Sequence, residues 1–454
     1  MHYSFSREIP VEDGFDVLVA GGGPAGYSAA ISAARLGARV VLVENNGYLG
    51  GLATSGLVTR MDTTSDGRRM IVGGIMQELL QRMYAQGYIS PYYSFDRFTQ
   101  RRGMYTPFDP EGMKLLLEEM TQDAGVDVRF FTRVIDAAVH SSGSGVCVDG
   151  VVVADVEGLR LLRARAYIDA TGDAVLADAC GAPCWRAGTQ DTPRIMPPTL
   201  CGFFTNIPWE QIPMKDKSPS AHARMLQKAL DDGFFSQNDQ LVPGIARNCA
   251  DTGGMNAGHL FGLDALNAKA LSAGMRQGRK QVQEYAAYYR KYVPGFQNIH
   301  LVSTAACMGV RESRRIIGEY TLTYEDYRTR RQFPDQIGIY TKTIDVHPYD
   351  LSQEEYERFR RQVAQTDTLA DGECYGLPYG ILIPRGFSNL WAAGRCASSD
   401  QSVNGAIRVQ PSSAVLGQAA GTAAFLCARD GKPAGAPDMA LLLNTLRAAG
   451  AILS

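Results

Sequence analysis

The chain has 454 residues, which is enough for two or three packed domains. Hydrophobic residues make up 45% and charged residues 20%, an ordinary globular balance that argues against disorder. The formal net charge is -2 and the pI is about 6.3, so no broad basic surface is available to neutralise phosphates. Nucleic acid is therefore not expected as a partner.

Nine cysteines are scattered along the chain without a CxxC pair, and an odd number cannot all pair internally. This pattern predicts free thiols in a reducing compartment and no zinc or other metal site. The first residues carry no positive stretch followed by an apolar core, so no signal peptide is expected. No run of 18 apolar residues occurs, so we expect no membrane span and a cytoplasmic protein.

The first predicted unit is a strand, a tight turn, a helix and a second strand. Residues 15–20, FDVLVA, form a continuous apolar run, as in a parallel strand buried on both faces. An alanine-rich helical stretch occupies 24–36 and ends at Gly37, and a second strand covers 39–44. Parallel crossovers of this kind are nearly always right-handed.

The turn in this unit reads GGGPAG and fits the GxGxxG pattern of dinucleotide-binding folds. Gly21 permits the tight turn, Gly23 lets a pyrophosphate approach the backbone, and Gly26 allows helix and strand to pack closely. The helix start offers free N–H groups and the positive end of its dipole to phosphates. Glu44 ends the next strand 18 residues after Gly26 and is expected to accept hydrogen bonds from ribose hydroxyls.

Helical and strand patterns then alternate in blocks. Residues 61–102 carry apolar positions at helical spacing, and 109–124 form a second amphipathic helix opened by a proline. Three strands follow, separated by short turns, at 126–140, 146–156 and 159–170. They indicate an antiparallel meander whose last strand is buried in a parallel sheet.

The stretch from 203 to 340 is less regular and indicates an inserted domain, whereas strand 390–393 and helix 412–428 return to the first style. The predicted fold class is α/β: a Rossmann-like domain with a three-layer parallel sheet and a β-meander, plus an inserted α+β substrate domain. We assign a discontinuous cofactor domain to 1–65, 105–202 and 371–454, a helical insertion to 66–104, and a substrate or cap domain to 203–370.

Two later motifs distinguish FAD from NAD, which share the glycine pattern. A strand that follows a meander and ends in YIDATGD is typical of FAD-binding folds, where the Thr-Gly turn packs near the ribityl and phosphate groups. Near the C-terminus a strand runs into a loop, and an alanine-rich helix is expected to point its positive end at the flavin pyrimidine. The residues assigned from these motifs are Ala170, Thr171, Gly172, Asp173, Gly394, Arg395, Gly417 and Gln418.

These blocks resemble the bacterial FAD-dependent oxidoreductase family of the glutathione-reductase-like superfamily, and the likeness runs nearly end to end. The blocks that carry it are 17–44, 49–58, 167–183, 309–320, 375–398 and 407–424. The resemblance implies bound FAD and redox activity and leaves the substrate open. Loop 45–60 holds no His or Cys to attach the flavin, so we predict non-covalent FAD. The remaining residues assigned to the cofactor are Pro24, Ala25, Asn45, Gly50, Gly51, Thr54, Val134 and Arg408.

Five side chains are candidates for the chemistry. The run VRESRRIIG reads as an internal strand with charge on both faces, so Arg311 or Arg314 is expected to meet a substrate or flavin anion. A strand with one solvated face and a Glu–Arg pair is the alternative. His259 and His300 can reach the active site from the inserted domain, or be structural. Tyr375, before the last cofactor strand, either faces the flavin ring or lies in the core.

The leading hypothesis is an FAD-dependent oxidoreductase that transfers a hydride between flavin N5 and a small polar substrate, hydroxyl-bearing or anionic. The alternatives are an NAD(P)H-dependent flavin reductase, for which a second GxGxxG after a strand is missing, and an FAD monooxygenase. The acidic balance argues against tRNA-modifying flavoproteins, and a flavin-binding sensor would not need a large inserted domain. The electron acceptor and the oligomeric state, a homo-oligomer included, stay open.

Overall fold

The fold is organised around one seven-stranded sheet in the order β5-β2-β1-β8-β7-β6, with β17 also pairing with β8. Its strands are β1 Val11–Ala20, β2 Val40–Val43, β5 Asp127–Arg129, β6 Arg133–Ser142, β7 Gly145–Asp155, β8 Gly158–Asp169 and β17 Leu390–Ala392. The computed structural model describes residues 3, 6–90, 94–100, 103, 105–143, 145–190, 193–212, 219–241 and 244–454.

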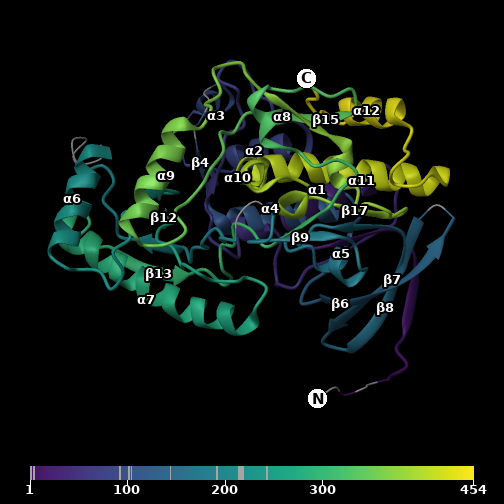
Figure 1. Ribbon diagram of the computed structural model, residues 1–454, viewed down its shortest axis with the longest axis horizontal. Helices are drawn as coiled ribbons and strands as arrows, with labels where there is room; N and C mark the ends of the chain where they lie inside the picture. The colour runs from purple at the N-terminus through teal and green to yellow at the C-terminus, as the bar shows by residue number, and fades with distance from the viewer. Residues whose placement is uncertain are drawn as a thin grey trace.

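Strand β8 joins the two parts of this sheet. It runs parallel to β1 and β17, and it is the last strand of the antiparallel meander β6-β7-β8. The end of β1 is buried on both faces, as its continuous apolar run predicts. The long strands of the meander extend to one end of the molecule (Figure 1). The predicted α/β class, with a Rossmann-like parallel sheet and a meander, is confirmed.

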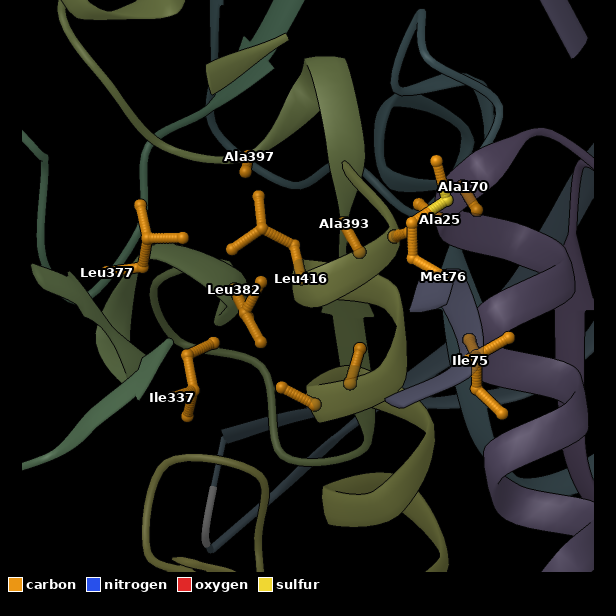
Figure 2. Packing of buried hydrophobic residues seen from close by; sticks show 14 of the residues in the cluster. Ala25, Ile75, Met76, Ala170, Ile337, Leu377, Leu382, Ala393, Ala397 and Leu416 are labelled. Atoms are coloured by element: carbon orange, nitrogen blue, oxygen red, sulfur yellow. The ribbon is translucent and has the colours of Figure 1, made fainter. Parts of the chain in front are cut away.

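Helices α1 (Pro24–Arg35) and α11 (Gln410–Asp430) pack on each other along their length. A Cβ atom at Gly417 would lie 2.0 Å from the carbonyl oxygen of Ala25, and one at Gly421 would lie 2.1 Å from that of Ala29. These glycines therefore let the two backbones touch. Figure 2 shows Ala25 and Leu416 among the side chains of this core.

The predicted helix 412–428 is present as α11, and Gly417 and Gln418, which were assigned to the cofactor, lie two turns inside it. Gln418 is buried and connects three helices: its Oε1 accepts from the Ile75 N–H at 3.0 Å, and its Nε2 donates to the Ala449 carbonyl at 3.3 Å. Both residues serve helix packing.

Four further helices and a pair of short antiparallel strands complete this part of the molecule. They are α2 Gly74–Ala85, α3 Phe95–Gln100, α4 Pro110–Asp123, α12 Met439–Ala448, β3 Arg60–Met61 and β4 Thr106–Pro107. The predicted helical insertion 66–104 contains α2 and α3, and its residues 91–93, 101, 102 and 104 lie outside the described part. Among the described residues, no helix has both the length and the apolar character needed to cross a bilayer.

A second region has a four-stranded sheet and its own core, in which Phe204, Tyr285 and Tyr289 are buried. It lies at the opposite end of the molecule from the meander (Figure 1). Its elements are β10 Gly202–Thr205, α6 Pro219–Asp231, β11 Ile245–Arg247, β12 Gly253–Met255, α7 Ala268–Tyr292 and β13 His300–Thr304.

The chain then returns to the first core earlier than predicted, because Leu322 and Ile337 pack in the same cluster as α1 and α11. The sequence-based prediction had extended the inserted domain to residue 370. The elements of this returning part are β14 Arg314–Ile316, which pairs with β9 Cys184–Arg186; β15 Gln336–Tyr340, which pairs with β16 Tyr375–Pro378; and helices α8 Tyr324–Arg328, α9 Gln353–Gln365 and α10 Gln401–Ile407. Helix α5 Val175–Ala179 follows β8, before the second region.

Candidate active site

A cavity of about 1160 Å³ lies between the two regions. Single-ligand pockets span about 300–1,000 Å³, so this space is large enough for a dinucleotide and a small second molecule. Most residues assigned to the cofactor line it: Gly21, Gly23, Pro24, Ala25, Glu44, Asn45, Gly51, Val134, Ala170, Thr171, Gly172, Asp173, Gly394, Arg395 and Arg408. The residues assigned to the cofactor that do not line it are Gly26, Gly50, Thr54, Gly417 and Gln418.

The glycine turn has the geometry that a pyrophosphate needs. Gly21 has φ +94°, and a Cβ there would lie 2.6 Å from the Ala170 carbonyl oxygen. A Cβ at Gly26 would lie 1.7 Å from the Gly21 carbonyl oxygen, so only glycine lets α1 approach β1 this closely. At Gly23 the nearest atom to a Cβ is 3.8 Å away, and no side chain caps the start of α1. The free N–H groups of this helix start are therefore available to an anion.

Glu44 lies at the edge of this turn and is only 6% exposed. Its Oε2 accepts from the Gly22 N–H at 2.7 Å, and its Oε1 accepts from the backbone and side-chain N–H groups of Asn46 at 2.8 and 2.7 Å. The carboxylate lines the cavity and keeps acceptor capacity for ribose hydroxyls.

Gly50 and Thr54 support the cofactor turn from behind. The Gly50 N–H donates to the Gly22 carbonyl at 2.9 Å, and the Thr54 hydroxyl donates to the Leu49 carbonyl at 2.6 Å. Gly51 packs against Gly23, since a Cβ at Gly51 would lie 2.8 Å from the Gly23 Cα. Backbone contacts thus hold the loop that contains Gly50 and Gly51 against the glycine turn.

The loop after β8 is ordered by buried Asp169, whose Oδ1 accepts from the N–H and the hydroxyl of Thr171. Burial raises the pKa of Asp169. Farther along, Asp173 forms an ion pair with Arg395 at 2.7 Å and accepts from the Ser313 hydroxyl at 2.5 Å. These contacts join the loop after β8 to the segments around residues 313 and 395 at the cavity wall.

The five predicted catalytic residues occupy different places. Arg311 and His259 line the cavity, whereas Arg314, His300 and Tyr375 do not. Only residues 314–316 of the charged run form a strand, and Arg311 lies in the loop before it. Arg314, in the strand, pairs with Asp178 at 2.7 Å.

His300 and Tyr375 lie away from the cavity. His300 is exposed at the start of β13, where its backbone pairs with Thr205. Tyr375 is completely buried in β16, and its ring packs against Tyr327 and Tyr340. For Tyr375, the core interpretation is the one that the packing supports.

A buried chain of hydrogen bonds runs from Asp239 through His259 to His347. Asp239 Oδ1 accepts from the Tyr356 hydroxyl at 2.8 Å and the Leu241 N–H at 3.0 Å, so the group is a carboxylate. Its Oδ2 lies 2.8 Å from His259 Nδ1, which therefore carries a proton. Burial lowers the pKa of His259, so its ring is neutral and its Nε2 accepts from His347 Nδ1 at 2.8 Å. The network thus leaves His347 Nε2 with a free lone pair.

His347 lines the cavity, and its Nε2 lies 3.5 Å from Asp345 Oδ2. Burial and the positive charge of Arg311 lower the pKa of His347 to about 3, so its ring is neutral near pH 7. Burial raises the pKa of Asp345, but the positive charges of Lys342 and Arg408 lower it, and the pKa lies well below its usual range. A base and a carboxylate therefore face each other at the cavity wall.

Two arginines complete this end of the cavity. Arg311 Nη1 donates to the Pro197 carbonyl and, at 2.9 Å, to the Thr199 hydroxyl. Burial and the nearby Arg408 lower the pKa of Arg311 to about 10. Arg408 pairs with Asp345 at 3.2 Å, and its Nε is buried without an acceptor in the described residues.

Sequence analysis missed Asp239, Asp345 and His347. Each lies in a loop without a recognisable motif, and 239 and 347 are more than a hundred residues apart. The contacts with His259 identify Asp239 and His347, and the contact with His347 identifies Asp345.

A family model described as FAD dependent oxidoreductase matches residues 16–446. The chain belongs to this family. Its cofactor is FAD, and it is an enzyme of redox chemistry. The resemblance predicted from the sequence blocks is thereby confirmed.

Curated relatives match only parts of the chain. Dihydrolipoyl dehydrogenase of Trypanosoma brucei brucei is 53% identical over 47 residues, 10% of each chain. Thiamine thiazole synthase of Aeropyrum pernix is 33% identical over 177 residues, 36% of this chain and 56% of that protein. The chain thus matches a tenth of the first relative's length and little more than half of the second's.

Solved structures align over most of the chain at low identity. A geranylgeranyl bacteriochlorophyll reductase-like protein from Thermoplasma acidophilum shows 13% identity over 96% of this chain and 83% of its own, with a TM-score of 0.47. A myxobacterial chondrochloren halogenase shows 14% identity over 96% and 78%, with a TM-score of 0.46.

The residues present in this FAD-dependent oxidoreductase fit its cofactor. The start of α1 offers free N–H groups to the pyrophosphate, and Glu44 offers acceptors to the ribose. Gln410 and Ser413, in the first turn of α11, line the cavity, so the positive end of this helix meets it there. The predicted start of this helix, at 412, lies in the same turn.

Proposed function

We propose that this FAD-dependent oxidoreductase transfers a hydride between FAD and a small polar molecule, with His347 handling the accompanying proton. The observation that carries the proposal is the acceptor nitrogen of a neutral His347 at the cavity, backed by His259 and Asp239. When bound, FAD accepts or donates the hydride at N5.

The side chains around His347 have distinct tasks in this proposal. In the oxidative direction, His347 Nε2 accepts the proton of a substrate hydroxyl or amine. The imidazolium that forms faces Asp345 at 3.5 Å, and this carboxylate stabilises its charge. Asp239 and His259 hold the ring in the tautomer that presents its lone pair. In the reductive direction, the same nitrogen returns the proton.

The first experiment records the visible spectrum of the purified protein before and after acid precipitation. Flavin released into the supernatant would support non-covalent FAD. Anaerobic titration with hydroxy acids, sugars and NAD(P)H then tests the reaction. Bleaching by an organic substrate supports the proposal, whereas bleaching by NAD(P)H alone would replace it with a flavin reductase. Oxygen consumption with hydroxylation of the substrate would indicate a monooxygenase.

A matched pair of variants tests the role of His347. His347→Gln is expected to lower the rate of flavin reduction by about 10²- to 10⁴-fold, with unchanged flavin content. His300→Gln, at an exposed site on β13, is the control and should reduce at the wild-type rate. Equal rates in the two variants would exclude His347 as the acid–base group.

A further inference from the structure

Lys342, Arg408 and Arg311 bring three positive charges to the histidine end of the cavity. Lys342 pairs with Asp62 at 3.0 Å, and Arg408 pairs with Asp345 at 3.2 Å. For Arg311, no carboxylate of the described residues lies within ion-pair distance. A buried arginine is costly unless an anion completes its environment.

Arg311 presents an open edge to the cavity. Its Nη1 is fastened to Pro197 and Thr199, which fixes the guanidinium plane. Its Nε and Nη2 have no hydrogen-bond acceptor in the described part of the chain, and the residue lines the cavity. These two groups form the planar fork that binds a carboxylate through two parallel hydrogen bonds.

We infer that the substrate is a small carboxylic acid whose carboxylate binds the open edge of Arg311, beside His347. The inference rests on the proposed function, since it names the substrate class of the same site. A fixed guanidinium loses little conformational freedom on binding, and the enclosed cavity strengthens the charge-assisted hydrogen bonds.

Binding at Arg311 also affects the base. The charge of Arg311 lowers the pKa of His347, together with burial and His259, while Asp345 raises it. A carboxylate on Arg311 would neutralise this charge and raise the pKa of His347. The complex then holds more protons than the free enzyme, so binding should take up protons and tighten as the pH falls. The acid itself becomes protonated near pH 4, which sets the lower limit of this range.

The test uses the oxidised holoenzyme and two matched probes, lactate and 1,2-propanediol, which differ in a carboxylate. Calorimetry in buffers of different ionisation enthalpy measures affinity and proton uptake between about pH 8 and about pH 5. We expect lactate, or larger acids such as malate and succinate, to bind with proton uptake, and the diol to bind at least about tenfold more weakly. Equal affinity for acid and diol, or no binding of any acid, would overturn the inference.

Arg311→Met and Arg314→Met form the decisive pair. Arg311→Met should weaken carboxylate binding by about 10- to 100-fold and remove the proton uptake, whereas Arg314→Met should bind as the wild type does. Arg311→Lys keeps the charge but loses the fork, and we expect a loss of about tenfold or less. If Arg311→Met does not fold, Arg311→Lys serves alone. Wild-type affinity of Arg311→Lys for the carboxylate, at low and at high salt, would show that the two parallel hydrogen bonds of the guanidinium are not needed and would overturn the inference. Loss of FAD from Arg311→Met or Arg311→Lys would assign Arg311 to the cofactor and overturn the inference.

The two proposals fail separately. A neutral polyol that bleaches the flavin in a His347-dependent reaction would leave the proposed function intact and refute the inference that the substrate is a carboxylic acid. Acids that bind through Arg311 without any redox reaction would do the opposite.

Discussion

The cofactor end and the histidine end of the cavity share one space but are built from different parts of the chain. At the cofactor end, the first turn and Glu44 come from one strand–helix–strand unit within 30 residues, and several glycines line the cavity with their backbone. At the histidine end, Asp239, His259, Arg311 and His347 come from loops spread over more than a hundred residues, and side chains make the surface.

This difference shows how each end responds to change. A backbone-built site depends on space, because an added methyl group displaces atoms that have no rotamer to escape into. A side-chain-built site depends on ionisation and tautomer, which one altered partner can reverse without moving the fold. Three predictions sharpen or break this contrast.

The largest effect is expected at the cofactor end, from Gly26→Ala. Its Cβ would lie 1.7 Å from the Gly21 carbonyl oxygen, so α1 must move away from β1. We expect the free energy of unfolding to fall by about 3 kcal/mol or more and the purified protein to lose its flavin colour. Thermal unfolding and flavin content measure both. Gly435→Ala, where a Cβ meets nothing within 4 Å, is the control, and equal stability of the two variants would break the contrast.

At the histidine end, Asp239→Asn should preserve the fold and impair the reaction. An asparagine amide can donate to His259 Nδ1, which would reverse both tautomers and place a proton on His347 Nε2. We expect flavin reduction to slow by about 10- to 100-fold with unchanged flavin content. Stopped-flow reduction under anaerobic conditions measures the rate. Asp251→Asn, at an exposed carboxylate that accepts from Thr205, is the control; an unchanged rate in Asp239→Asn would refute the tautomer relay.

The smallest effect concerns stability against pH. The pKa of His347 is about 3 in the folded protein and about 6.5 in the unfolded chain, so the unfolded chain binds more protons between these values. The part of the free energy of unfolding that depends on a neutral, buried His347 is fully present above about pH 6.5. It is lost as the pH falls toward 3, at up to about 1.4 kcal/mol per pH unit. Denaturant titrations should show a shallower pH dependence in His347→Gln than in the wild type. Identical slopes would mean that His347 is not buried as a neutral ring.

Much of the fold followed from local patterns. The apolar run before GGGPAG, the helix that ends at Gly37 and the meander are all present, because buried strands and tight turns impose their own residue types on short segments. Helix α11 was placed correctly, but the residues chosen to meet the cofactor, Gly417 and Gln418, lie away from the cavity, since an alanine-rich helix contains no signal that marks which turn meets it. The inserted domain was extended too far because Leu322 and Ile337 are apolar in either core.

By itself the sequence determined the dinucleotide-binding unit, the class of cofactor and most of the residues that line the cavity at that end, since these depend on backbone conformations that glycine and short motifs encode locally. Only the tertiary structure decided which charged residues matter. Arg311 and Arg314 are three positions apart, yet one lines the cavity and the other pairs with Asp178. His259 acquired its role from Asp239 and His347, which no local pattern connects to it. The physical reason is that ionisation and tautomer are properties of a side chain's surroundings, and folding assembles those surroundings from distant parts of the chain.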